Sequence, residues 1–304
     1  MVILAWSLAS VIVGADALVL DWLPISFKGL GSVIVCVLLL IGAALALGER
    51  LPRIALLANC AALWCVMLVA GPILTYCAAT VAAPLRDAEF VRLDAVLGFD
   101  WSAHAVWIAG HPLLGEALLV AYRTLLFQGL LAMVYLPLCG RETQFFETYS
   151  ATVLSIMLTA AGSAVLPARG PVSYFFPDLA STVPHLPHLF ALRSGQPTVF
   201  ELSSLTGIVN FPSFHCAAGL LNIWGFRRCG LASWLVAALN GVMLVSIPAI
   251  GTHYLVDLLG GAAVAAASLA GALVARRAAA PAARYLSRSS AIVSSAALLP
   301  ESRS

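Results

Sequence analysis

The stretch FKGLGSVIVCVLLLIGAALAL, residues 27–47, decides the class of protein to which this chain belongs. After Lys28 it carries no charged residue, and at 1.5 Å per residue a helix of this length crosses the hydrocarbon core of a bilayer. Similar stretches recur along the chain, in which 62% of the 304 residues are hydrophobic and only 10% are charged. Soluble domains contain about 25% charged residues, so a soluble globular fold is excluded. The sequence predicts an all-α polytopic transmembrane helical bundle.

About eight candidate spans follow from the apolar stretches. They cover residues 1–20, 27–47, 54–81, 113–139, 147–166, 213–226, 231–250 and 254–274. The sixth is short. No basic residue precedes the apolar residues of the first, so we expect it to be a retained span rather than a signal peptide.

The distribution of Lys and Arg predicts how the bundle is oriented. The connections on one side hold Arg50, Arg53, Arg141, Arg227, Arg228, Arg276 and Arg277, and the tail adds three more arginines. The other side holds Lys28, Arg86, Arg92, Arg169 and Arg193. We therefore expect the first side, with both termini, to be cytoplasmic. The opposite side would carry residues 82–112, which suggest an interfacial helix with its turn, and a long loop, residues 167–212.

Composition also bears on partners and cofactors. A net charge of +2 gives no indication of a nucleic-acid partner. The seven cysteines show no CxxC spacing, and most lie within apolar stretches, where cysteine packs as a small hydrophobic residue. We expect neither a disulfide framework nor a zinc site.

Polar residues gather in three segments that the alternation of spans places on the same, non-cytoplasmic side. The segments are PARGP (167–171), FPSFHC (211–216) and GTHYLVD (251–257). Charged residues next to membrane spans are costly, so each is a functional hypothesis by default.

The spacing within these segments indicates chemistry on a phosphate group. His253 and Asp257 share a helix face, so the carboxylate can hold one ring nitrogen and leave the other free to attack. Ser213 stands at a helix start, where backbone amides favour an anion. His215, one turn in, is placed to give or take a proton, and Arg169 offers a planar fork for phosphate oxygens.

Each residue also has a structural interpretation. Arg169 alone is typical of an interfacial anchor, and Asp257 alone of a polar contact between helices. Histidines outside the three segments are expected to cap helices or to hydrogen-bond neighbours: His104, His111, His185 and His188. The shared side and spacing of the three segments favour the functional interpretation for the cluster.

At these residues the chain resembles the type 2 phosphatidic acid phosphatase superfamily of membrane lipid phosphatases and phosphotransferases. The family pattern is Lys-x6-Arg-Pro, then Pro-Ser-x-His, then Ser-Arg-x5-His-x3-Asp. Residues 212–215 match the second segment in full, and His253 with Asp257 matches the end of the third. Arg169 takes the arginine of the first, with one glycine before the proline. Residues 93–101 resemble the inositol phosphorylceramide synthase-like branch.

The resemblance implies an enzyme of the cell inner membrane that acts on a lipid phosphate or phospholipid without metal or cofactor. His253 would form a phosphohistidine supported by Asp257. His215 would protonate the leaving alcohol and then activate water or an acceptor alcohol. Arg169 and the amide of Ser213 would hold the phosphate oxygens.

Two cations of the family pattern are missing, because Gly162 stands in place of the lysine and Ile247 in place of the arginine. Arg193 in the loop or Arg123 in the fourth span would compensate. Arg123 also shares a helix face with Glu116, so a structural pair is an equal alternative.

The resemblance divides the chain into two extra helices (1–53), a catalytic domain with a six-helix core (54–275) and a basic, disordered cytoplasmic tail (276–304). Hydrolysis and headgroup transfer are equally favoured. A transporter or flippase for an anionic lipid is the alternative from another class, and it predicts broken segments near the middle of the bilayer in paired halves. A purely structural membrane protein would not need both histidine motifs on one side.

Overall fold

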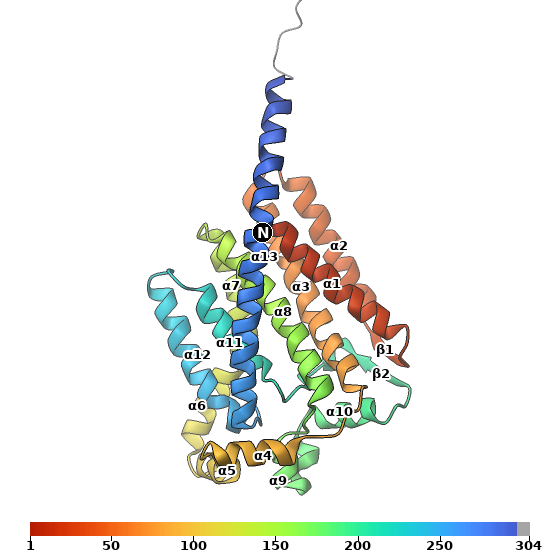
Figure 1. Ribbon diagram of the computed structural model, residues 1–304, viewed down its shortest axis with the longest axis vertical. Helices are drawn as coiled ribbons and strands as arrows, with labels where there is room; N and C mark the ends of the chain where they lie inside the picture. Colours follow the sequence, from red (N-terminus) through yellow and green to blue (C-terminus); the bar gives the residue numbers. More distant parts are fainter. Residues whose placement is uncertain (297–304) are drawn as a thin grey trace, which may run out of the picture.

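The chain folds into a bundle of helices that run roughly side by side, with short helices lying across one end (Figure 1). The computed structural model describes the backbone of residues 1–296 and the side chains of residues 1–278. In chain order the elements are α1 (Val2–Leu20), β1 (Ile25–Lys28), α2 (Leu30–Leu47), α3 (Pro52–Ala79), α4 (Asp87–Val96), α5 (Trp101–Ala109), α6 (Pro112–Arg123), α7 (Leu125–Leu138), α8 (Glu142–Val165), α9 (Pro171–Phe175), η1 (Pro177–Thr182), α10 (Leu186–Arg193), β2 (Thr198–Glu201), η2 (Leu202–Ser204), α11 (Phe214–Gly225), α12 (Leu231–Ile250) and α13 (Leu255–Ala296).

The prediction of an all-α polytopic bundle is confirmed. Within the described residues, six helices are long and apolar enough to cross a membrane, and a seventh results if α5 and α6, bent by 110°, form one span. The other expected spans are shorter or divided: residues 213–226 form the short α11, and residues 113–139 are split between α6 and α7. These apolar helices support an integral membrane protein.

Helix α8 is the centre of the bundle and packs against α1, α3, α7, α11 and α13. Half of its buried residues are Ala, Ser or Thr: Thr148, Ser150, Ala151, Ser155, Thr159, Ala160 and Ser163. Small residues let helix backbones approach closely, which favours packing between helices that lie in lipid. The C-terminal end of α8 is thereby held at a fixed place, next to the starts of α11 and α13.

A buried ion cluster joins three parts of the bundle at the end opposite the short helices. The carboxylate of Glu147 in α8 pairs with Arg227, just after α11, and with Arg276 in α13. Glu147 is buried, and its two partners are partly exposed. A buried carboxylate is costly unless it is paired, and here each oxygen has its own arginine.

The long loop after α8 has more structure than its prolines suggest. Between residues 167 and 212 it forms α9, η1, α10, β2 and η2. Strand β2 pairs in parallel with β1 from the connection between α1 and α2, in a register that brings Lys28 beside Glu201. Their ammonium and carboxylate groups lie 3.0 Å apart. This small sheet ties the N-terminal helices to the loop.

Two other expected segments map onto the short helices and the last helix. Residues 82–112 contain α4 and α5, and α4 lies across the end of the bundle (Figure 1). The expected tail, residues 276–304, begins within α13, and residues 297–304 lie outside the described residues.

We expect Glu147→Gln to lower the free energy of unfolding by about 2 kcal/mol, because the two arginines then lose their counter-charge. Reversible unfolding in detergent micelles with increasing SDS measures this. Glu116→Gln is the control, because Glu116 is exposed and makes no ion pair within the described residues, so its change should stay within about 0.5 kcal/mol. Equal losses from the two variants would contradict the role of the cluster.

Candidate functional site

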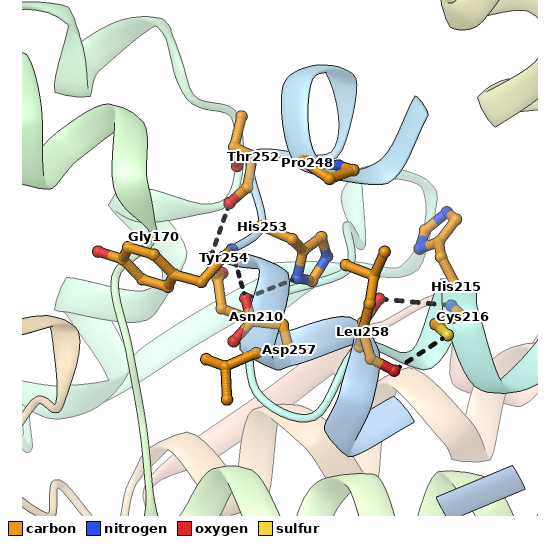
Figure 2. A network of polar contacts seen from close by, with 12 residues as sticks. Gly170, Asn210, His215, Cys216, Pro248, Thr252, His253, Tyr254, Asp257 and Leu258 are labelled. Atoms are coloured by element: carbon orange, nitrogen blue, oxygen red, sulfur yellow. Dashed lines mark hydrogen bonds and ion pairs between the residues drawn. The ribbon is translucent and has the colours of Figure 1, made fainter. Parts of the chain in front are cut away.

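The three polar segments of the sequence meet at one end of the bundle, where α8 ends and where α11 and α13 begin (Figure 2). The side-chain amide of Asn210 donates to the carbonyl of Thr252 at 3.0 Å, and the backbone amide of Ser213 donates to the carbonyl of Asp257, also at 3.0 Å. Gly170 has φ +93° and lies against Asn210, so a side chain would have no room there. Close backbone approach therefore holds the segments together.

His253 and Asp257 form a buried pair at the start of α13. Nδ1 of His253 lies 3.1 Å from Oδ2 of Asp257, and the same oxygen accepts the backbone amide of Tyr254 at 2.9 Å. Both side chains are buried. When Nδ1–H donates to the carboxylate, Nε2 retains its lone pair.

The surroundings of His253 favour the neutral ring. Burial lowers its pKa to about 4, and a hydrogen bond to the backbone of Asn210 opposes this shift in part. At pH 7 the imidazole is then uncharged, the form in which Nε2 is a nucleophile. The preceding Thr252 has φ +55°, a strained conformation for a β-branched residue of the kind that gathers at functional sites.

His215, in the first turn of α11, packs against Tyr122 near the end of α6. The two rings are stacked, with centroids 4.2 Å apart and an interplanar angle of 12°, and the Tyr122 hydroxyl lies 3.3 Å from Nδ1 of His215. A contact at Nδ1 orients the ring and leaves Nε2 available. The sequence analysis did not single out Tyr122, whose only signal is its position beside Arg123 within an apolar stretch.

Two buried aspartates of α4 accept hydrogen bonds from backbone amides of the polar segments. The two oxygens of Asp94 accept the amides of Leu255 and Val256, each at 2.9 Å, so a carboxylate from another helix caps α13. Burial raises the pKa of Asp94, and these two amides oppose the shift.

Asp87, on the same face of α4, makes the corresponding contacts with the end of α8. It accepts the amides of Arg169 at 3.2 Å and Gly170 at 3.0 Å, together with the hydroxyl of Tyr254 at 2.9 Å. The arginine segment and the histidine segment are therefore attached to one carboxylate. Neither Asp87 nor Asp94 was predicted as a site residue, although Asp94 lies in the stretch 93–101 that carried a resemblance.

The residues expected to bind phosphate are engaged with the protein itself. The amide of Ser213 is used by the carbonyl of Asp257, and its hydroxyl accepts the amide of Cys216 at 3.4 Å as the N-cap of α11. The Arg169 guanidinium lies over the ring of Tyr174, 5.7 Å from its centroid. Arg193 donates to the carbonyls of residues 82 and 83 and so anchors the loop.

A cavity of about 510 Å³ adjoins the two histidines. Its wall includes Tyr122, Arg123, His185, His215 and His253, and Arg123 makes no ion pair with a carboxylate within the described residues. The rest is largely apolar. Residues 207–210 of the long loop contribute to it together with residues of four helices: Trp64, Met67 and Leu68 of α3, Leu125 and Leu126 of α7, Ile156 of α8, and Phe214 and Ala218 of α11. An amphiphile with a charged head and a hydrocarbon part fits this lining.

The four other histidines differ in their contacts. His104 does not line the cavity, and its Nε2 is buried without a hydrogen-bond partner among the described residues. His111 contacts the carbonyl of Trp107 at 2.7 Å, and His188 contacts the hydroxyl of Tyr76 at 2.6 Å, as expected for structural histidines. His185 instead lines the cavity, and its Nε2 is buried without a hydrogen-bond partner among the described residues. The sequence analysis had given His185 a structural role.

The two positions that lack a cation are closed by packing. A Cβ at Gly162 would lie 2.7 Å from Cδ of Pro212, so α8 approaches the start of α11 too closely for a lysine. Ile247 is fully buried and packs with Ala121, Cys216 and Met243. An arginine there would place a charge among apolar side chains.

Comparison with known proteins gave one match. A family model described as the PAP2 superfamily matches residues 88–271, more than half of the chain. This range includes the three polar segments, Tyr122 and His185. The comparisons with curated proteins and with solved structures gave no match. Among the residues that the structure describes, no three His, Cys, Asp or Glu side chains are grouped as metal ligands.

We expect Gly162→Ala to lower the free energy of unfolding by about 1–3 kcal/mol, because the rigid ring of Pro212 cannot move away from the added methyl group. The matched control is Gly241→Ala in α12, where no atom lies within 4 Å of the added Cβ. Helix propensity predicts a small gain in stability for that variant. Thermal unfolding in detergent micelles distinguishes the two, and a stable Gly162→Ala would show that the position is not closed.

Proposed function

Because the chain belongs to the PAP2 superfamily, we propose that it is a lipid phosphatase or headgroup phosphotransferase that works through a phosphohistidine on His253. Membership itself supports a phosphatase-type enzyme. The observation that carries the finer proposal is the buried contact of 3.1 Å between Nδ1 of His253 and Asp257, with His215 on the wall of the same cavity. Nucleophile, orienting carboxylate and acid–base group are then within one site.

In the first step, Nε2 of His253 attacks the phosphorus atom of a lipid phosphate or phospholipid. A P–N bond forms while the P–O bond to the leaving alcohol breaks, and the electron pair stays with that oxygen. His215 donates the proton that this oxygen takes up. Asp257 stabilises the positive charge that develops on the His253 ring.

In the second step, water or an acceptor alcohol attacks the phosphorus. A P–O bond forms, the P–N bond breaks with its electron pair returning to Nε2, and the acceptor proton passes to His215. Water as acceptor gives hydrolysis, and a lipid hydroxyl gives headgroup transfer. We propose that the apolar part of the cavity receives the hydrocarbon part of the lipid.

Arg169 and Ser213 remain our candidates for binding the phosphate. Ser213 would act by capping α11, whose first amides favour an anion. Arg169 would act by its guanidinium, at the segment that Asp87 holds next to Tyr254. Arg123, on the cavity wall, is a further candidate for contact with the substrate.

We also propose that the site faces the non-cytoplasmic side of the cell inner membrane, with both termini in the cytoplasm. The arginines at the opposite end of the bundle support this, since cytoplasmic connections carry an excess of Lys and Arg. Arg141 and Arg228 lie there, near the Glu147 cluster. The division into residues 1–53, 54–275 and 276–304 likewise remains a proposal, and the matched range lies within the second part.

Phosphorus NMR of the purified protein in mixed micelles with EDTA tests the reaction. The micelles contain phosphatidic acid, a polyprenyl phosphate, phosphatidylinositol and ceramide, and wild type is compared with His253→Asn. We expect wild type to release free phosphate or to form a new diester, and the variant to lose at least about a hundredfold in rate. A variant as active as wild type would exclude the mechanism, and a wild type that gives no new phosphorus signal would favour a flippase.

The acid limb of kcat/KM provides a second test, because it reports groups of the free enzyme. Attack requires unprotonated Nε2, and the unprotonated fraction falls as pH drops through the pKa of His253. Since burial lowers that pKa to about 4, activity on a diester substrate should persist well below pH 6.5. An acid limb near pH 6.5 would mean that His253 is not the buried nucleophile.

A further inference from the structure

The phosphate site lacks a cation at two of the three positions where the family pattern has one. Packing closes both Gly162 and Ile247 to charged side chains. Arg169 is stacked on Tyr174, and Arg193 is bound to backbone carbonyls of residues 82 and 83. A phosphoryl group bonded to His253 carries negative charge on its oxygens, so these oxygens need partners on the cavity wall, where Arg123 is already one candidate.

His185 has the position and the free atom for this role. It precedes α10 in the long loop and lines the same cavity as His215 and His253. Its Nε2 is buried without a partner in the described part of the chain. Nε2 of His104 is also buried without a partner among the described residues, but His185 lines the cavity beside the proposed nucleophile and His104 does not, so His185 points to a ligand there.

We propose that His185 is a third histidine of the site, whose Nε2 takes up a proton as substrate binds and donates a hydrogen bond to a phosphoryl oxygen. This inference rests on the proposed function of the same cavity. It assigns to a neutral histidine the part that a fixed lysine or arginine plays in the family pattern.

The groups around His185 explain why the proton arrives with the substrate. Burial, and then the nearness of His253, lower the pKa of His185 to about 4, the backbone of Arg169 opposes the shift, and His188 adds to it. His188 is itself held by the hydroxyl of Tyr76 at 2.6 Å. His185 is therefore neutral in the empty site. An entering anion favours the charged ring and shifts its pKa upward, so binding and protonation are coupled.

Calorimetry with inorganic phosphate measures this coupling directly. Titrations of the full chain in detergent micelles at pH 7.5, in two buffers of different ionisation enthalpy, give the number of protons taken up on binding. We expect His185→Gln to bind phosphate about tenfold more weakly and to take up about one proton fewer than wild type, since one imidazole binds one proton.

Two further variants separate charge from structure. His188→Gln changes a histidine of the same loop that does not line the cavity, so its proton uptake should equal that of wild type. His185→Lys supplies a permanent cation, so it should bind phosphate as tightly as wild type without the additional proton. If His185→Gln does not fold, His185→Lys decides alone: unchanged proton uptake in that variant would overturn the proposal.

The remaining outcomes also have definite meanings. Unchanged affinity and proton uptake in His185→Gln would overturn the role of His185, and so would weaker binding with unchanged proton uptake. Trapping of the phosphohistidine by a rapid alkaline quench, which preserves the acid-labile P–N bond, reports separately on His253. If wild type forms the phosphohistidine, and His185→Gln equals wild type in phosphate affinity and proton uptake, this inference is removed and the proposed function stands.

Discussion

The site depends on the carboxylates of α4 that bind backbone amides at the start of α13 and the end of α8. Asp94 holds Leu255 and Val256, and Asp87 holds the backbone at residues 169 and 170. Without these contacts, each amide would be a buried donor without an acceptor, and each carboxylate a buried charge without a partner. The same hydrogen bonds satisfy both groups and so offset the free-energy cost of burying them. Segments far apart in the chain thereby share one support.

Close helix packing determines the electrostatics of the site. The contact between α8 and the start of α11 brings the ring of Pro212 onto Gly162, which fixes where α11 begins but excludes a long cation. The same tight packing buries His253 and lowers its pKa. The histidines of a site built in this way are neutral when it is empty, so their charge depends on what binds.

The sequence predicted those features that depend on local spacing or on composition. The apolar stretches predicted a membrane bundle, and the four-residue spacing of His253 and Asp257 predicted a contact that the structure contains. The sequence did not predict a role in the site for Tyr122, Asp87 or His185. Their positions depend on how α6, α4 and the long loop pack against other elements. The sequence also predicted one span over residues 113–139 and not its division into α6 and α7. No feature of this apolar stretch indicates a break at Thr124.

The parallel pairing of β1 with β2 attaches the first two helices to the loop that carries His185. A chain shortened to begin at α3 would expose the backbone edge of β2, with Phe200 no longer covered by Phe27. Exposed strand edges invite pairing with other chains. Strand β1, between α1 and α2, thus covers the edge of β2 and protects it from pairing with other chains. The position of the loop that carries His185 depends on this pairing.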